Sequence, residues 1–198
     1  MDQHEKTEQY GMVIDFLEEK EKMNIENGMK WLYKAIQAGD IGAMNELAYL
    51  YFTGQRVKQD VSEGERWLRR SAEAEDKWAM LDLACRLLDG DGLDQDVIEG
   101  EQWLRQAAEH QYPIAMRILG YRLLEGQGLQ QNLEEGEQWL RQAAELQEPV
   151  AMRVLGYRLI KGQGLQQHIE EGEQWLQKAA EAGEAIAMRE WGKYLIHK

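Results

Sequence analysis

The apolar residues of this chain form two kinds of helical segment that alternate along the sequence. In the first kind, residues 114–125 place apolar side chains at helical spacing between Pro113 and Gly126. Proline favours the first turn of a helix, and glycine favours the position just past its end. In the second kind, residues 133–146 carry apolar and small side chains on one helical face. We therefore predict an A helix over residues 113–125 and a B helix over residues 133–146.

This pair of segments recurs with a period of 36 residues along nearly the whole chain. A unit of this size cannot bury its own apolar face, so neighbouring units must stack and share one continuous core. Tryptophans beside Leu and Ala-Ala mark the B segments, and we expect them in that core. A glycine three residues before each of them lets helix backbones approach closely. The tryptophans are Trp31, Trp67, Trp103, Trp139 and Trp175, and the glycines are Gly28, Gly64, Gly100, Gly136 and Gly172.

The predicted fold class is all-α, an α-α superhelix (solenoid) of about five 36-residue helix-turn-helix repeats. Only two prolines occur, and residues that favour helix are abundant. No linker composition interrupts the repeats, so we expect one domain over residues 1–198. Its repeats span 25–184, with atypical capping helices at 1–24 and 185–198. Residues 18–22 replace the glycine-bearing turn, and the first helix either ends there or continues through them.

The formal net charge of −13 argues against nucleic acid and anionic membranes as partners, because proteins that bind them gather Lys and Arg. No segment is apolar and long enough to span a bilayer, and residues 1–9 lack the apolar core of a signal peptide. Cys85 is the only cysteine, which excludes an internal disulfide and fits a reducing compartment. We expect a cytoplasmic protein.

Residues suited to catalysis or metal binding are scarce. The possible nucleophiles are two serines, two threonines and one cysteine, with no G-x-S-x-G turn and no glycine-rich phosphate loop. The four histidines are scattered, and one cysteine cannot build a structural zinc site. Residues 89–96 hint at a calcium loop, but the equivalent turns lack its carboxylates and Gly100 stands at the closing position. We expect no cofactor, no metal and no enzyme activity, although a triad assembled only in space leaves no sequence pattern.

The B helices begin with runs of glutamate, such as Glu134, Glu135 and Glu137. One interpretation is an acidic docking face. The other is that these side chains are solvated and stabilise the positive N-terminal end of each helix, and we favour this second interpretation.

Two stretches of the chain, residues 115–144 and 151–180, share the pattern Ala…Leu-Gly-Tyr…Gly-x-Gly-Leu-x-Gln…Trp-Leu-x-x-Ala-Ala. This pattern resembles the Sel1-like repeat family, which is related to tetratricopeptide arrays. The resemblance implies a right-handed α-α solenoid that acts through protein contacts and has no catalytic residues. Glycine replaces the usual alanine before each Trp. The single Cys85 fits poorly with the cysteine-rich branch, for which penicillin recognition has been suggested.

In the related tetratricopeptide units, the A helices line a concave surface. Mapped by the period, one row of this chain reads Asn45, Leu81, Arg117, Arg153 and Arg189, a second reads Tyr49, Cys85, Tyr121, Tyr157 and Lys193, and a third begins at Trp78. Arg and Tyr commonly anchor interfaces. The alternative is that each Arg only pairs with a Glu of a neighbouring repeat. The predicted partner-binding residues are Tyr49, Trp78, Leu81, Cys85, Arg117, Tyr121, Arg153, Tyr157, Arg189 and Lys193.

The resulting hypothesis is a non-enzymatic, bacterial, cytoplasmic module that binds an acidic or aromatic segment of another protein. Within it we favour an inhibitor or immunity protein for one toxin or enzyme, by analogy with the family. One alternative is a general adaptor or scaffold in signalling or assembly. The other is a β-lactam or cell-wall hydrolase of the cysteine-rich type. We expect a monomer or a weak homodimer, with the face near Trp191 and Leu195 as the dimer contact.

Overall fold

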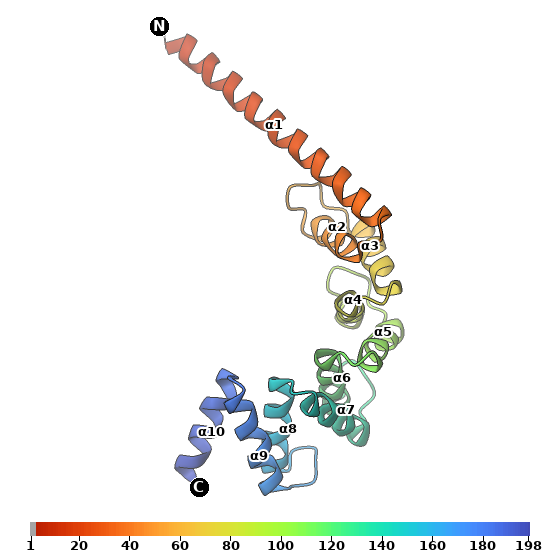
Figure 1. Ribbon diagram of the computed structural model, residues 1–198, viewed down its shortest axis with the longest axis vertical. Helices are drawn as coiled ribbons and strands as arrows, with labels where there is room; N and C mark the ends of the chain where they lie inside the picture. Colours follow the sequence, from red (N-terminus) through yellow and green to blue (C-terminus); the bar gives the residue numbers. More distant parts are fainter. Residues whose placement is uncertain (1–2) are drawn as a thin grey trace. The chain divides into compact units, whose positions relative to one another are not determined.

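The computed structural model describes the backbone of residues 3–198 and the side chains of residues 19–198. Within that range the chain forms ten helices and no strand (Figure 1). The A helices are α2 (Ile41–Thr53), α4 (Lys77–Asp89), α6 (Pro113–Glu125), α8 (Pro149–Lys161) and α10 (Ala185–His197). The B helices are α3 (Val61–Glu73), α5 (Val97–Glu109), α7 (Leu133–Glu145) and α9 (Ile169–Glu181), and α1 (Gln3–Gln37) precedes them all.

The predicted helix bounds are confirmed. The A helix predicted over residues 113–125 matches α6, and the B helix predicted over 133–146 matches α7 to within its last residue. The first helix continues through residues 18–22, because α1 runs without a break from Gln3 to Gln37. No helix of the described residues combines the length and apolar character needed to cross a membrane.

Local side-chain chemistry sets where the helices begin and end. Asp96 and Asn132 precede α5 and α7, and their side chains accept the backbone N–H of Glu99 and Glu135. At the other end of an A helix, Gly126 adopts φ 67°, a left-handed conformation that glycine reaches without steric cost. These signals recur with the sequence period, so the helices recur with it as well.

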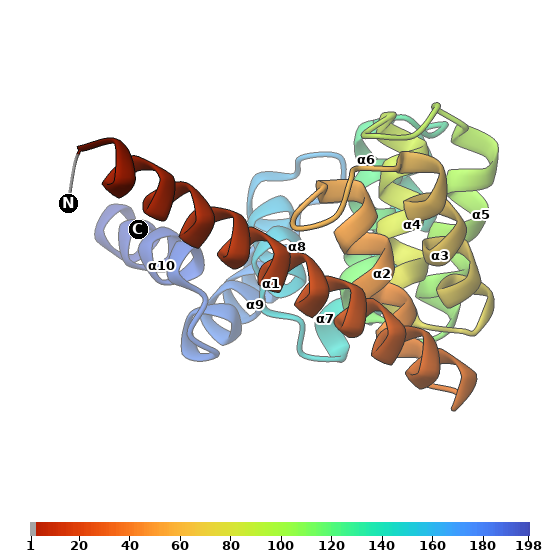
Figure 2. The same ribbon diagram turned by 90° about the horizontal axis from the view of Figure 1, so that it is seen from above.

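The chain consists of two compact units, one over residues 1–79 and the other over residues 80–198. In the first unit α2 packs on α3 (Figure 2). In the second unit α6 packs on α7 and α8 packs on α9, and α9 packs in turn on α10. The single domain expected over residues 1–198 stays a prediction.

Glycines allow close contact where A and B helices cross. A Cβ atom added to Gly156 would lie 2.8 Å from the Gly172 carbonyl oxygen, and one added to Gly172 would lie 2.7 Å from the Gly156 carbonyl oxygen. The role predicted for the glycines before the tryptophans is therefore confirmed at this crossing. It is wrong for Gly28, which has open space around it.

The core consists mainly of leucine and alanine, and the tryptophans enter it unequally. Trp67 is buried at 3% exposed, whereas Trp31 is 68% exposed, so the core prediction is wrong for Trp31. Tyr33 packs edge-on against Trp67 at 5.7 Å between ring centroids. Trp31 lies in α1, which no described helix precedes, and its ring is instead 4.3 Å from the Lys34 amine. The three later tryptophans are half-buried.

Candidate functional site

The half-buried tryptophans belong to a polar ladder that joins successive B helices. Glu135 accepts a hydrogen bond from the indole N–H of Trp139 at 3.2 Å and forms an ion pair with Arg105 of the preceding B helix. Glu171, Trp175 and Arg141 repeat the arrangement one unit later. The Arg105 guanidinium lowers the pKa of Glu135, and the Arg141 guanidinium lowers that of Glu171.

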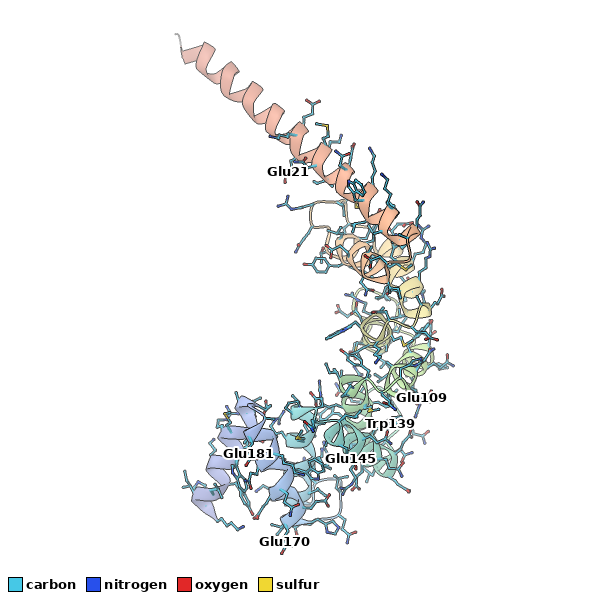
Figure 3. The ribbon with its side chains drawn as sticks, viewed as in Figure 1. Glu21, Glu109, Trp139, Glu145, Glu170 and Glu181 are labelled. Atoms are coloured by element: carbon cyan, nitrogen blue, oxygen red, sulfur yellow. The ribbon has the colours of Figure 1, made fainter. Side chains whose placement is uncertain are left out.

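This ladder partly changes the interpretation of the glutamate runs. Glu135 and Glu171 are neither docking residues nor simply solvated, because they connect repeats. Glu170 is exposed at the start of α9, as are Glu109, Glu145 and Glu181 near the ends of the B helices (Figure 3). Sequence reasoning missed the ladder, although Arg105 and Glu135 recur in register as Arg141 and Glu171.

The A helices carry the predicted partner-binding residues, and those of the first unit lie at its surface. Tyr49 of α2 and Trp78 at the start of α4 are exposed. In the second unit Leu81 is only 8% exposed, so it offers little surface to a partner. Burial stabilises its aliphatic side chain. Cys85, one turn further along α4, is half-buried.

Arg117 and Arg153 lie in ion pairs between repeats. Arg117 of α6 is 3.2 Å from the carboxylate of Glu148, and Arg153 of α8 is 3.2 Å from that of Glu184. The same two carboxylates accept backbone N–H groups at the start of α8 and α10. The alternative in which each arginine pairs with a neighbouring Glu therefore holds for these two residues. Their side chains are mostly buried, and their charge is already compensated.

A second pair of arginines, missed by sequence reasoning, joins the far ends of the A helices. Arg122 lies 2.6 Å from the Asp89 carboxylate of the preceding A helix, and Arg158 pairs in the same way with Glu125. Both guanidinium groups also donate to a carbonyl of the loop that follows their own helix. Both side chains are more than nine-tenths buried. The signal available in the sequence was an Arg that recurs 33 residues after an acid.

Four predicted residues of the second unit keep a substantial exposed surface. Tyr121 on α6 and Tyr157 on α8 occupy equivalent positions and are 41% and 40% exposed. Arg189 and Lys193, both on α10, are exposed as well. The surface left to a partner is therefore aromatic on α6 and α8 and cationic on α10.

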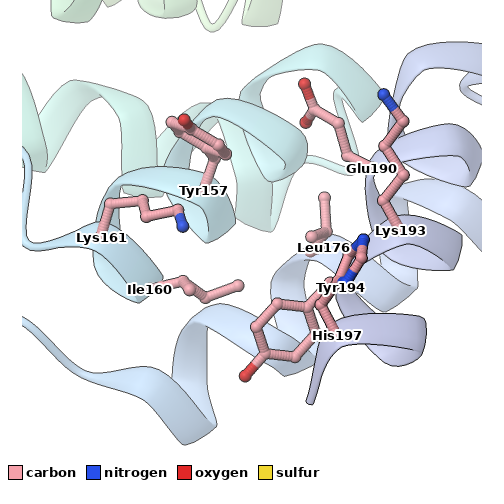
Figure 4. A pocket seen from close by; sticks show the side chains of 8 residues that line it. All are labelled: Tyr157, Ile160, Lys161, Leu176, Glu190, Lys193, Tyr194 and His197. Atoms are coloured by element: carbon pink, nitrogen blue, oxygen red, sulfur yellow. The ribbon is translucent and has the colours of Figure 1, made fainter.

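Tyr157 and Lys193, predicted from different repeats, line one cavity of about 370 Å³ (Figure 4). Lys161 and His197 add two basic groups to its wall, and Glu190 adds a carboxylate that is 4.0 Å from Arg153. The remaining lining residues are Ile160, Leu176 and Tyr194. Basic groups outnumber the single carboxylate, in a chain whose formal net charge is −13.

The environment of Cys85 works against nucleophilic chemistry. Burial raises the pKa of the Cys85 thiol, with the Arg122 charge acting weakly in the opposite direction. Because the thiolate is the nucleophilic form, a raised pKa lowers the nucleophilicity of this side chain near neutral pH. Among the described residues, no group of three His, Cys, Asp or Glu side chains is placed to hold a metal ion.

The repeats of this chain match the model of one protein family. The model of the Sel1 repeat matches residues 18–40, 41–76, 79–112, 113–148 and 149–184. The chain belongs to the Sel1 repeat family. The predicted family and the all-α superhelix fold class are confirmed.

Solved structures of Sel1 repeat proteins are similar to this chain. A protective antigen of uropathogenic Escherichia coli strains is 29% identical with a TM-score of 0.75, over 83% of this chain and 35% of the antigen, so this chain spans about a third of its length. A Sel1 repeat protein from Oxalobacter formigenes is 28% identical with a TM-score of 0.70, over 88% of this chain and 74% of that one.

A more distant similarity shows the fold alone. Helicobacter pylori cysteine-rich protein B is 20% identical with a TM-score of 0.53, over 67% of this chain and 95% of that one. Comparison with curated proteins gave no match. Sel1 repeat proteins are in general modules for protein interaction.

Proposed function

We propose that this chain is a non-enzymatic module that binds one partner protein through the A-helix face of its second unit. The face consists of Tyr121, Tyr157, Arg189 and Lys193. The observation that carries the proposal is the cavity shared by Tyr157 and Lys193, two residues on different helices that the mapping onto tetratricopeptide units places in one row. That this face is concave stays a prediction.

The chemistry of this face favours an acidic or aromatic segment as the bound part of the partner. Tyr121 and Tyr157 offer large aromatic surfaces at a small entropic cost, which is typical of residues that anchor interfaces. Arg117 and Arg153 are already paired, so the available positive charge lies instead on Lys161, Arg189 and Lys193. The attraction for an acidic segment is therefore centred on α8 and α10.

Within this function we favour an inhibitor or immunity protein over a general adaptor, and a bacterial cytoplasm as its location. The strong acidity of the chain and the family analogy support this choice. The two roles differ in stoichiometry and affinity, because an inhibitor forms a tight one-to-one complex and an adaptor binds several partners weakly. The raised pKa of Cys85 works against the hydrolase alternative.

Affinity capture from the native host tests the proposal with three baits. They are the unmodified chain, the double variant Tyr157→Ala with Lys193→Glu, and Lys178→Glu, which makes the same charge change on the exposed surface of the B helix α9. We expect one protein to be retained in equal molar amount by the first and third baits and lost from the second. Equal retention by all three baits, or retention by none, contradicts the proposal.

A further inference from the structure

The contact between the last two A helices differs from the two preceding contacts at two linked positions. Between α4 and α6 the pair is Asp89 with Arg122, and between α6 and α8 it is Glu125 with Arg158. Between α8 and α10, the equivalent positions hold Lys161 in place of the acid and Tyr194 in place of the arginine. Both members of the pair have changed together.

The exchange opens space at this contact. In the preceding contact Arg158 lies between the helices, more than nine-tenths buried, with its guanidinium 5.7 Å from the Tyr121 ring. At the last contact the Tyr194 hydroxyl instead donates to Glu173 of α9 at 2.5 Å. The cavity of about 370 Å³ lies here, and both Lys161 and Tyr194 line it (Figure 4).

The lining of this cavity suits a carboxylate on a short aliphatic stem. Lys161, Lys193 and His197 supply basic groups, and Figure 4 shows the Lys161 side chain directed into the space between α8 and α10. Ile160 and Leu176 supply an apolar wall. Glu190 lies close to Arg153, so its charge is partly compensated. An ammonium group in a partly enclosed site pairs with a carboxylate more strongly than one in open water.

We propose that this cavity binds a glutamate side chain of the partner protein, with its carboxylate on Lys161 and its methylene groups against Ile160 and Leu176. At the two preceding contacts Asp89 and Glu125 pair with an arginine, and Lys161 stands at the position of those acids, so the group that complements it is a carboxylate in place of the arginine. A side-chain carboxylate is favoured over a chain terminus because its methylene groups match the apolar wall of Ile160 and Leu176. The inference rests on the proposed function and names the chemistry of its central contact.

The inference is tested by titrating the isotope-labelled chain with three small probes and following its amide chemical shifts. N-acetyl-glutamate N-methylamide carries only a side-chain carboxylate, and N-acetyl-glutamine N-methylamide is its neutral counterpart. N-acetyl-glutamine with a free terminus carries only a main-chain carboxylate. We expect saturable shifts in α8 and α10 from the first probe, and binding weaker by roughly tenfold from the other two. Equal effects from the first two probes overturn the site, and stronger binding of the third overturns the choice of side chain.

Variants of Lys161 test whether the glutamate probe binds at this residue. Lys161→Gln is expected to lower the affinity for the glutamate probe by roughly tenfold. Lys178→Glu on α9 is expected to leave that affinity unchanged. Lys161→Glu with Tyr194→Arg rebuilds the pair seen at Glu125 and Arg158, and it should abolish binding of the probe in a chain that remains folded. Undiminished binding by Lys161→Gln or by the rebuilt pair overturns the inference.

The two proposals fail in different ways. If the glutamate probe binds as expected but partner capture is indifferent to Tyr157→Ala with Lys193→Glu, the pocket stands and the proposed function fails. If partner capture depends on that double variant but the probe causes no shifts, the protein-binding face stands and the glutamate pocket is wrong.

Discussion

Arg158 of α8 pairs with Glu125 at the end of α6, and its guanidinium lies 5.7 Å from the ring of Tyr121. One buried side chain therefore joins two successive A helices and supports an exposed tyrosine of the proposed binding face. Arg122 makes the equivalent link between α6 and Asp89 of α4. The contacts that stack the repeats and the surface offered to a partner are thus built from the same helix positions.

Removing this link should weaken the fold. We expect Arg158→Ala to lower the free energy of unfolding by about 2 kcal/mol, because it removes a buried side chain that pairs with Glu125 and donates to the Gln163 carbonyl of the following loop. Arg189→Ala removes an exposed arginine from α10 and should change stability by less than about 0.5 kcal/mol. Urea denaturation followed by circular dichroism measures both, and an equal effect of the two variants would be inconsistent with the link.

The glycine crossing of α8 and α9 gives a second matched comparison. Gly156→Ala places a methyl group 2.7 Å from the backbone nitrogen of Leu176, so the helices must separate, and we expect a loss of about 2–3 kcal/mol. Gly192→Ala in α10 meets nothing within 4 Å and should stabilise the chain by about 0.5–1 kcal/mol through helix propensity. Thermal melts of both variants show whether the two shifts have opposite signs.

The two repeat-equivalent tryptophans Trp31 and Trp67 should differ sharply on truncation. Trp67→Ala removes a ring that is only 3% exposed and should cost about 3 kcal/mol or more. Trp31→Ala removes a ring that is 68% exposed and should cost less than about 1 kcal/mol, mainly through its lost contact with Lys34. Denaturation midpoints of the two variants test this, and similar losses would show that Trp31 is buried in solution.

The ladder between B helices predicts a specific dependence of stability on pH. The pKa of Glu135 is lowered in the folded chain from its ordinary value of 4.5, chiefly by Arg105. A carboxyl whose folded pKa is depressed contributes stability in full above its unfolded pKa and loses it as pH falls through the folded pKa. The stability difference between the unmodified chain and Glu135→Gln should therefore be constant above about pH 5 and shrink below 4.5. Denaturant titrations over a pH series measure that difference, and one that grows on acidification would contradict the ladder.

Local signals explain why so much of the fold could be predicted from sequence. Pro113 and Gly126 mark the two ends of α6 with chemistry that acts within one turn, and the period then transfers those bounds to the other A helices, α2, α4, α8 and α10. Partner pairs could not be predicted in the same way. Whether Arg117 is free or paired depends on where Glu148 of the next repeat lies, and that is set by how the helices pack.

The candidate site was predictable in part for the same reason. Tyr121 and Tyr157, which the period places at equivalent positions, are both exposed, but the burial of Leu81 depends on tertiary packing. The cavity at Lys161 and Tyr194 arises where the repeat pattern departs from itself, and only the structure shows what that departure opens. Positions where this chain departs from its repeat therefore indicate the candidate site as much as the repeated positions do.

The central claim is that a partner protein binds the A-helix face around Tyr157 and Lys193. Calorimetric titration of the captured partner into the unmodified chain and into Tyr157→Ala with Lys193→Glu tests it most directly. We predict a one-to-one complex for the unmodified chain and an affinity weaker by about a hundredfold for the double variant, whose melting temperature is unchanged. An affinity that stays within about threefold in a fully folded double variant would contradict the claim.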